Sequence, residues 1–392
     1  MTINSASVNI RGYRGRDIAT GAGRPALLFS AVTTAMRMRP YATVSSMHDS
    51  RTFGDLLAEV SDKAARFDTV LRRPRARVLV ALGNSPGYIS TMLSLLARGD
   101  IPVLANPALP LTAMRELIEE CGIDAVVASG QAGGIRLDER SWAQRTGFDG
   151  DRPALHRDTE LCRVASAPSR RLVCLEYSAT AVLNAATAWV GASKLRESDR
   201  TLCFAGLFGR FGFHTATVAN LVAGADLVLP AGTHAPGNIH RHLAAESPTV
   251  LVAEPAVYQA MVQGTREDLS VDVAAALRRI RLRLSPHSVA SSVAARVRAV
   301  SGPITICYGL DETGPVAYGV DAADGASGVH LLSGVRVEAR STDGEQYARV
   351  HTKSLATTYL NDPLEFERSL TGDGSYLSRS LAGLPASVVD AG

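Results

Sequence analysis

The hydrophobic and polar positions of this chain follow two spacings in turn, which predict strands and helices. Continuous apolar runs, typical of strands buried on both faces, occupy residues 77–84, 101–106 and 123–129. Apolar residues at helical spacing occupy residues 52–71, 85–100 and 111–122. Thr52 precedes the first of these helices as an expected cap, and Ser85 with Pro86 begins the second. Units that alternate in this order predict a parallel sheet covered by helices.

The alternation resumes after a polar stretch at about residues 131–170, which is rich in Gly, Arg and Asp and is expected to be a linker. A strand and a long Ala-rich helix are predicted first, followed by further strands and helices, at residues 171–195, 199–206, 213–224, 225–230, 238–247, 249–255 and 256–264. After residue 328 the pattern changes to short strands with a tight turn at "TDGE". The sequence predicts an α/β protein of three subdomains: 1–165, with an N-terminal extension and the linker, 166–327, and a small β-rich subdomain at 328–392.

Composition and charge exclude several classes of protein. The 392 residues are 46% hydrophobic and 20% charged, which suits a large buried core. A net charge of +3 does not indicate a nucleic-acid-binding surface. No apolar stretch approaches the roughly eighteen residues of a membrane span, and the amino terminus lacks the hydrophobic segment of a signal peptide. We therefore expect a cytoplasmic protein that binds neither nucleic acid nor membrane. The five cysteines lack metal or redox spacing and are expected to be reduced thiols.

Four segments, in this order, carry a family resemblance: "LLARGDIPVLANPALP" (95–110), "VLVAEPAVYQAM" (250–261), "YGLDETGP" (308–315) and "TTYLNDP" (357–363). With them the chain resembles, over about residues 50–384, the amino-terminal domain of the adenylate-forming superfamily. That superfamily includes acyl- and aryl-CoA synthetases, adenylation domains of nonribosomal peptide synthetases, and luciferase. The resemblance implies two helix-covered, mostly parallel sheets packed in an αβαβα arrangement, together with the small β-rich subdomain.

The segments that bind ATP in this superfamily differ here. Its phosphate-binding loop is rich in Ser, Thr and Gly and ends in Pro-Lys-Gly, whereas the matching stretch "VASAPSRRLVCLEY" (164–177) has no glycine. In the Tyr-Gly-x-Thr-Glu turn the Thr contacts a phosphate and the Glu holds Mg²⁺. Here Asp311 replaces the Thr, and Glu312 keeps the Glu position. A carboxylate about 4 Å from a phosphate oxygen would repel it by roughly 4 kcal/mol.

Three further departures agree. Pro286 and His287 replace the Gly-Gly-Ala beside the adenine, and Ser380 replaces the aspartate that binds the ribose. The chain ends near that point, so the mobile carboxy-terminal lid domain with its catalytic Lys is expected to be absent. The resemblance therefore implies a retained scaffold for which neither ATP nor Mg²⁺ is expected as a cofactor, and no metal site is predicted.

The acyl or aryl pocket is the part of the family site that the sequence retains. The family places it between the helix after "LFGRFGFHT" (207–215) and the strand "ITICYG" (304–309). Its expected substrate-binding residues are Tyr177, Phe208, Gly209, Phe211, Phe213, Tyr308 and Gly309. The aromatic residues among them suit a small acyl or aryl group. Tyr177, at a frequent His position, either orients a carboxylate or caps the core.

The candidate catalytic residues are Cys307, His287, Asp311, Glu312 and His214. A thiol beside a pocket with a nearby His base can form a thioester, and two adjacent carboxyl groups should have one raised pKa. Each candidate keeps a structural alternative. In these alternatives, Cys307 is a small buried hydrophobe, His287 packs in a loop, and His214 begins a helix. In the same way, Asp311 and Glu312 form a solvated pair in the turn.

Three hypotheses remain open. In the first hypothesis, the chain is an ATP-independent enzyme that acts on an activated acyl or aryl group, such as a carrier-protein or coenzyme A thioester, by transfer, cyclisation or hydrolysis. Alternatively it is a catalytically silent partner that binds an acyl ligand, a carrier protein or a synthetase. The third hypothesis is residual adenylation with a lid supplied by another chain. A second copy of the chain, forming a homodimer, is also an open partner.

Overall fold

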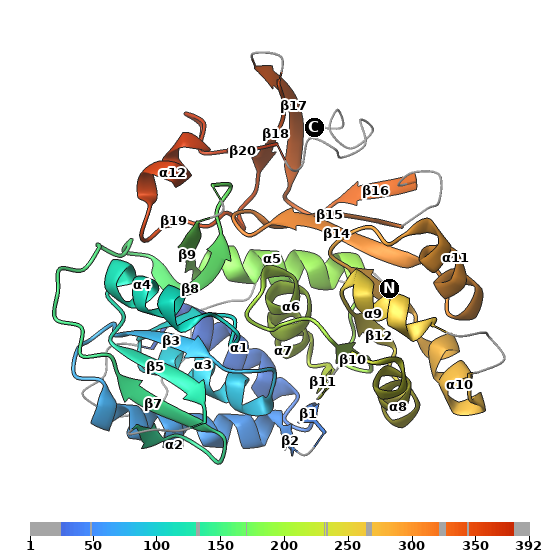
Figure 1. Cartoon of the computed structure of the whole chain (residues 1–392), viewed down its shortest axis with the longest axis horizontal. Helices are drawn as coiled ribbons and strands as arrows, with labels where there is room; N and C mark the ends of the chain where they lie inside the picture. Colours follow the sequence, from blue (N-terminus) through green and yellow to red (C-terminus); the bar gives the residue numbers. More distant parts are fainter. Residues whose placement is uncertain are drawn as a thin grey trace.

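A computed structural model of the chain describes residues 25–47, 49–130, 134–169, 171–230, 232, 234–263, 269–320, 327–342 and 345–379. Ser380, which replaces the ribose-binding aspartate of the resemblance, lies outside these residues. Within them, the chain forms two large sheets, one small sheet and the helices between and around them (Figure 1).

The first sheet shows, among the described residues, eight strands in the order β19-β9-β8-β4-β3-β5-β7-β6. These strands are β3 (Arg77–Ala81), β4 (Ile101–Leu104), β5 (Ala125–Ser129), β6 (Ile135–Arg136), β7 (Ser141–Arg145), β8 (Thr159–Ser166), β9 (Leu172–Ser178) and β19 (Thr358–Tyr359). The predicted parallel pairing is confirmed where β3 lies between β4 and β5. The expected linker at 131–170 is wrong, because it contributes β6 and β7 at one edge of the sheet and β8 between β9 and β4.

The second sheet has nine strands in the order β16-β15-β14-β13-β12-β10-β11-β1-β2, counted over the described ranges. They are β1 (Thr43–Ser46), β2 (Asp49–Thr52), β10 (Arg200–Cys203), β11 (Asp226–Leu229), β12 (Val250–Val252), β13 (Leu282–Ser285), β14 (Ile304–Leu310), β15 (Gly314–Val320) and β16 (Ser327–Leu331). The expected subdomain boundaries do not follow the sheets. The boundary at 165/166 passes through the antiparallel pair β8–β9, and β1 pairs with β11 about 180 residues further along the chain.

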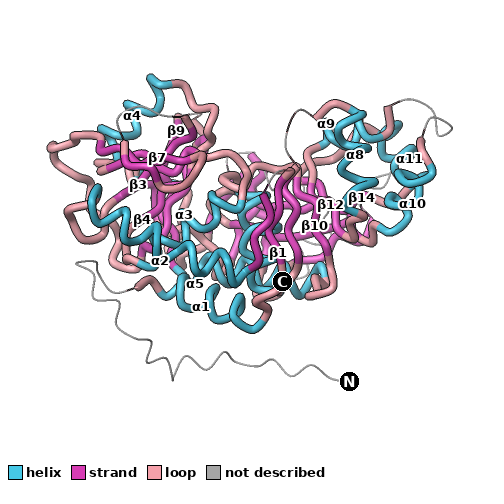
Figure 2. Tube along the Cα trace, turned by 90° about the horizontal axis from the view of Figure 1, so that it is seen from below, coloured by secondary structure: helices cyan, strands magenta, loops and turns pink. Residues whose placement is uncertain are grey.

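The helices lie in three layers around the two sheets. Figure 2 shows α3 and α5 between the strands of the first sheet and those of the second, with α8, α10 and α11 outside the second. The helices are α1 (Leu27–Met38), α2 (Phe53–Val70), α3 (Pro86–Ala97), α4 (Leu111–Cys121), α5 (Ala179–Ser193), α6 (Arg210–Gly212), the π-helix η1 (Phe213–Val218), α7 (Ala219–Ala223), α8 (Pro236–Glu246), α9 (Pro255–Met261), α10 (Val271–Arg279), α11 (Ser291–Val300) and α12 (Pro363–Arg368). The predicted αβαβα arrangement is confirmed.

Local chemistry begins the helices where the sequence predicts. Thr52 caps α2, and its hydroxyl and backbone exchange hydrogen bonds with Asp55 in a capping box. Ser85 caps α3 by accepting a hydrogen bond from Tyr88. Between the sheets, the largest apolar cluster joins α1, α2, α3 and α5, with Trp189 of α5 nearly inaccessible.

The third unit is the predicted small β-rich subdomain. β17 (Arg336–Thr342), β18 (Glu345–His351) and β20 (Tyr376–Ser378) form an antiparallel sheet. β19, which lies between β18 and β20 in the sequence, pairs instead with β9 of the first sheet.

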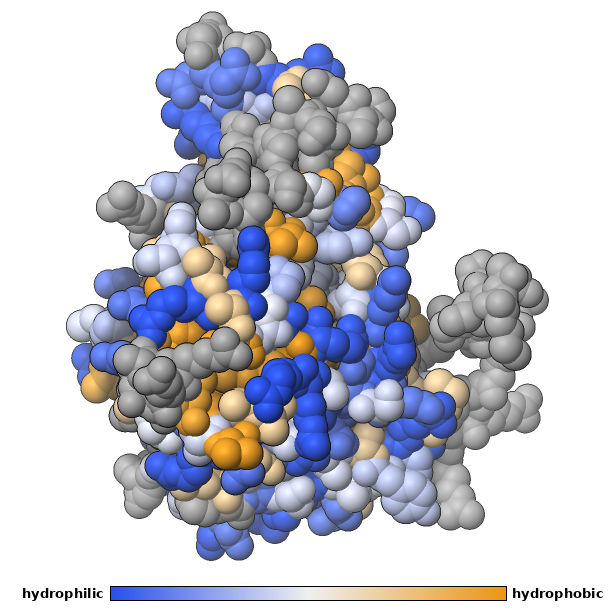
Figure 3. All heavy atoms as spheres, turned by 90° about the vertical axis from the view of Figure 1, so that its right-hand side faces the viewer, coloured by the Kyte–Doolittle hydropathy of each residue, from blue (hydrophilic) through white to orange (hydrophobic). Residues whose placement is uncertain are grey.

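Figure 3 shows that, on the side with α10 and α11, apolar atoms gather in one area bordered by hydrophilic side chains. In the described part of the chain, no helix has the length and apolar character needed to cross a membrane.

Candidate functional site

The turn that carries Asp311 and Glu312 connects β14 to β15 through closely spaced backbone. A Cβ atom on Gly309 would clash with the carbonyl oxygen of Gly314, so this approach requires glycine. Gly314 has a φ of 66°, in the left-handed region, and a β-bulge follows Tyr308. Bulges of this kind change the direction of the side chains that follow. The glycines of this stretch thus set the directions of Asp311 and Glu312.

Asp311 forms an ion pair with Arg163 of β8, a residue that the sequence prediction missed. The Arg163 side chain is 0% exposed, against 33% for Asp311. Its guanidinium carbon lies 5.5 Å from the ring centre of Tyr177 and 5.8 Å from that of Phe213. The Tyr177 hydroxyl also donates a hydrogen bond to the Asp311 carbonyl oxygen. A buried cation, which the sequence prediction did not include, therefore compensates the charge of Asp311.

Glu312 has a different environment. It is 5% exposed, and the Tyr359 hydroxyl donates to its Oε1 at 2.5 Å. Burial raises the pKa of Glu312, and the charge of Asp311 adds a smaller increase. The solvated alternative is thus wrong for Glu312. The predicted raised pKa is present, with burial rather than the neighbouring acid as its main cause.

The structure does not bring the predicted thiol and its base into contact. Cys307 is fully buried in the apolar cluster between the sheets, and burial raises the pKa of its thiol to about 12. His287 is exposed, and its carbonyl oxygen accepts a hydrogen bond from the Ser285 hydroxyl at 2.6 Å. Among the described residues, no hydrogen bond joins Cys307 to His287. A catalytic role for the pair remains a prediction.

The aromatic residues of the predicted lining do not all pack in one cluster. Phe208, Phe211 and Phe213 pack in or against the cluster between the sheets. Tyr308 packs against the clusters on the outer face of the second sheet and beside β17 and β18. Gly209 caps the short helix α6, and its N–H donates to the Gly206 carbonyl oxygen at 3.1 Å. Phe208, Phe211 and Phe213 therefore lie together, whereas Tyr308 packs elsewhere, and their role as a substrate lining remains a prediction.

His214, predicted as a helix-start residue, lies inside the π-helix η1 and is 0% exposed. Its ring packs edge-on against Phe213 and Tyr177. Burial, and then the charges of Arg163 and Arg210, hold its pKa well below the usual range, so the imidazole is neutral. Arg163 had one detectable signal in the sequence, since it is a charge flanked on both sides by apolar residues, in "LCRVA".

The turn between β8 and β9 is the stretch that the sequence resemblance matches to a phosphate-binding loop. The Ala167 N–H donates to the Arg171 carbonyl oxygen at 2.8 Å, which closes a short hairpin. The Ser169 N–H and hydroxyl donate to the carboxylate of Glu365, at 3.2 and 3.0 Å. Arg171 pairs with Glu120 and Asp362. Among the described residues of this turn, the donors of Ser169 and the guanidinium of Arg171 are thus engaged by carboxylates of the same chain.

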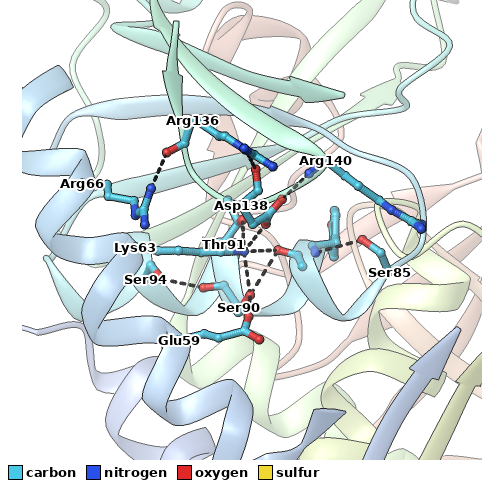
Figure 4. Close-up of polar contacts among 12 residues, drawn as sticks. Glu59, Lys63, Arg66, Ser85, Ser90, Thr91, Ser94, Arg136, Asp138 and Arg140 are labelled. Carbon is cyan, nitrogen blue, oxygen red and sulfur yellow. Dashed lines mark hydrogen bonds and ion pairs between the residues drawn. The ribbon is translucent and has the colours of Figure 1, made fainter. Parts of the chain in front are cut away.

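A cavity of about 550 Å³ lies at the carboxyl ends of β3 and β5, and none of the predicted site residues lines it. Lys63 of α2, 2% exposed, donates to Ser90 Oγ at 2.9 Å and to the Gly87 carbonyl oxygen at 3.2 Å, and pairs with Asp138 (Figure 4). These contacts fill the hydrogen-bonding capacity of the ammonium group. The other wall charges are of both signs, namely Arg51, Arg66 and Arg140 against Asp49, Glu59, Asp62 and Glu139. Lys63 therefore links α2, α3 and the turn before β7.

In the described part of the chain, no cluster of three or more His, Cys, Asp or Glu could hold a metal ion.

The chain is similar to known proteins in sequence and in fold. The sequence matches the protein family described as AMP-binding enzyme over residues 32–170 and 171–351. No curated protein sequence matches the chain. Its fold is similar to the N-terminal domain of FACL13 from Mycobacterium tuberculosis, with a TM-score of 0.75, 16% identity, and 90% of this chain and 95% of that chain covered.

Two further solved structures are similar in fold as well. ATP-bound MatB from Rhodopseudomonas palustris has a TM-score of 0.72 and 16% identity, with 89% of this chain and 75% of that chain covered. The benzoate CoA ligase from Burkholderia xenovorans has a TM-score of 0.72 and 18% identity, with 89% and 78% covered. At these identities the likeness shows the fold alone.

Proposed function

Because this chain belongs to the AMP-binding enzyme family, we propose that it binds an acyl or aryl group without ATP or Mg²⁺. In this proposal the ligand arrives in one of two forms, either already activated as a carrier-protein or coenzyme A thioester, or unactivated as a free organic acid. The chain then serves biosynthesis as an acyl-binding partner of a carrier protein or a synthetase.

The β8–β9 turn is the observation that carries the proposal. A triphosphate is held by backbone N–H groups, hydroxyls and cationic side chains that are free to donate. In this turn Glu365 takes the Ser169 N–H and hydroxyl, and Glu120 and Asp362 take Arg171. A phosphate group would have to displace these carboxylates and would be repelled by them.

The Asp311 turn supports the same proposal in a different way. Arg163 compensates the charge of Asp311, so the repulsion of roughly 4 kcal/mol expected for a bare carboxylate is an upper limit. The ion pair instead gives the Asp311 carboxylate a partner within the protein. The hydroxyls of Tyr177 and Tyr359 also donate hydrogen bonds to Asp311 and Glu312. Both acids of the turn therefore have hydrogen-bond or ion-pair partners without a nucleotide.

Ligand binding has more support than covalent chemistry at Cys307. A thiol with a pKa of about 12 is almost entirely protonated at neutral pH, and only the thiolate is a strong nucleophile. One observation favours a second candidate function, an ATP-independent transfer, cyclisation or hydrolysis. Burial raises the pKa of Glu312, and carboxyl groups with a raised pKa serve as general acids or bases in many enzymes.

Two measurements test the proposal. Titration calorimetry with ATP and Mg²⁺ is expected to give no binding, and pyrophosphate exchange with a panel of organic acids is expected to give no signal. Clear ATP binding or exchange would overturn the proposal in favour of residual adenylation. A panel of acyl thioesters, followed by mass spectrometry, separates the two remaining functions. Turnover that the Glu312→Gln variant loses while retaining binding would establish the enzyme, and binding without turnover the silent partner.

A further inference from the structure

The cavity of about 550 Å³ lies at a point of the first sheet where the strand connections diverge. β3 is hydrogen-bonded to β4 on one side and to β5 on the other. After β3 the chain continues to β4, whereas after β5 it continues to β6 and β7 on the opposite side. The loops that follow β3 and β5 therefore leave the sheet in opposite directions. In open α/β sheets, ligands bind in the crevice at such a point, outside the carboxyl ends of the strands.

The walls of this cavity carry charges of both signs in nearly equal number. Lys63 pairs with Asp138 (Figure 4), and Arg51 pairs with Glu59. An anionic ligand would meet the carboxylates and a cationic ligand the arginines, so neither sign of ligand charge is favoured. The five carboxylates and four cationic groups of the lining are Asp49, Glu59, Asp62, Asp138 and Glu139, and Arg51, Lys63, Arg66 and Arg140.

Two serines line the same cavity from neighbouring strands. Ser129 of β5 lies directly opposite Ser141 of β7. The Cβ atoms of such a pair lie about 4.5–5.5 Å apart on one face of the sheet. Ser141 is 2% exposed, and its hydroxyl has no hydrogen-bond partner among the described residues. The Asp138 carboxylate lies near this hydroxyl but is held by Lys63 and by the Arg140 N–H at 2.9 Å. Buried hydroxyls without a partner are rare in native proteins, so this one favours a polar ligand.

We propose that this cavity binds a neutral polyhydroxylated molecule, of the class of sugars and cyclitols. Each hydroxyl of such a ligand both donates and accepts hydrogen bonds, so it suits carboxylates, guanidinium groups and serine hydroxyls together. The volume lies within the range of about 300–1,000 Å³ that is typical of small-molecule sites.

The lining also excludes other classes of ligand. None of the described residues that line the cavity is aromatic, so a nucleobase or an aryl group has no ring to stack on. An acyl chain would remove water from charged walls without replacing its hydrogen bonds. The cavity shares no residue with the Asp311 turn, so this site is separate from the one of the proposed function.

The experiment compares neutral and charged ligands of the same shape on the native chain. Saturation-transfer NMR and titration calorimetry with glucose, trehalose and myo-inositol are expected to show binding. Glucosamine adds one positive charge to glucose, and glucuronate adds one negative charge. Each is expected to bind about tenfold more weakly than glucose, because its charge meets like charges in the wall.

Two serine variants place the ligand in this cavity. Ser141→Ala removes a hydroxyl without a partner, and Ser129→Ala changes an exposed position, so both variants should fold. Each should weaken glucose binding about three- to tenfold, the effect of one lost hydrogen bond. Ser193→Ala is the matched control. Ser193 is also buried, but its hydroxyl donates to the Trp189 carbonyl oxygen at 2.8 Å away from the cavity, so this variant should bind glucose normally.

Three results would overturn the inference. They are no binding of the three neutral compounds, glucosamine or glucuronate binding as tightly as glucose, and serine variants that bind glucose as the native chain does. The measurements with ATP and acyl thioesters decide the proposed function independently, because that function uses none of the residues of this cavity.

Discussion

The Arg163–Asp311 ion pair predicts a strongly asymmetric response to mutation. Asp311→Asn keeps the size of the side chain and removes its charge. Arg163 then stays 0% exposed without a counter-charge. An uncompensated buried charge of this kind costs about 3–5 kcal/mol of unfolding free energy. Because the remaining charge is fully buried, solvent screening does not reduce this figure.

The reverse change should cost much less. Arg163→Met removes the buried charge together with its unpartnered N–H groups, and the Asp311 left behind is 33% exposed and can be hydrated. We expect Arg163→Met to lower the free energy of unfolding by about 1–2 kcal/mol. The double variant Arg163→Met/Asp311→Asn should have nearly the same stability as Arg163→Met, because its Asp311→Asn change leaves no buried charge unpaired.

Urea unfolding followed by circular dichroism measures these differences from the transition midpoints. Glu246→Gln is the control, because its ion pair with Arg200 is about one third exposed and should be worth roughly 0.2–1 kcal/mol. If Asp311→Asn proves no more destabilising than Arg163→Met or Glu246→Gln, the buried ion pair does not stabilise the turn as reasoned here.

Three further predictions concern titration and reactivity. Burial raises the pKa of Asp138, but the Lys63 ammonium and its hydrogen bond outweigh this and hold that pKa below its usual range. Its stabilising contribution is therefore present above the unfolded pKa and is lost as the pH falls through the folded one. Acid unfolding curves should show this loss for the native chain and not for Asp138→Asn. Glu312 has the opposite sign: because its folded pKa is raised, stability should decrease as the pH rises from its unfolded to its folded pKa, and Glu312→Gln should remove that slope. Finally, the Cys307 thiol, buried with a pKa of about 12, should resist iodoacetamide in the native protein and react after unfolding in urea, as peptide mass spectrometry can check; fast native labelling would contradict the burial.

Much of the fold could be predicted from the sequence because its signals are local. The runs at 77–84 and 101–106 became β3 and β4, and Thr52 and Ser85 cap the helices they precede. The stretch 131–170 was mistaken for a linker because short strands with one polar face resemble loops in composition. The site was predicted less well. Its turn was identified, but Arg163, which neutralises that turn, was not.

The sequence by itself determined which segments are strands and helices, since hydrophobic spacing and capping residues act within a few positions. It also determined that residues 164–177 contain no glycine, the residue on which a phosphate-binding loop depends. Only the tertiary structure decided which charges meet. Arg163 and Asp311 are 148 positions apart, and Glu312 and Tyr359 are 47 apart. Such partners leave no periodic pattern, because the folding of the two sheets against each other is what brings them together.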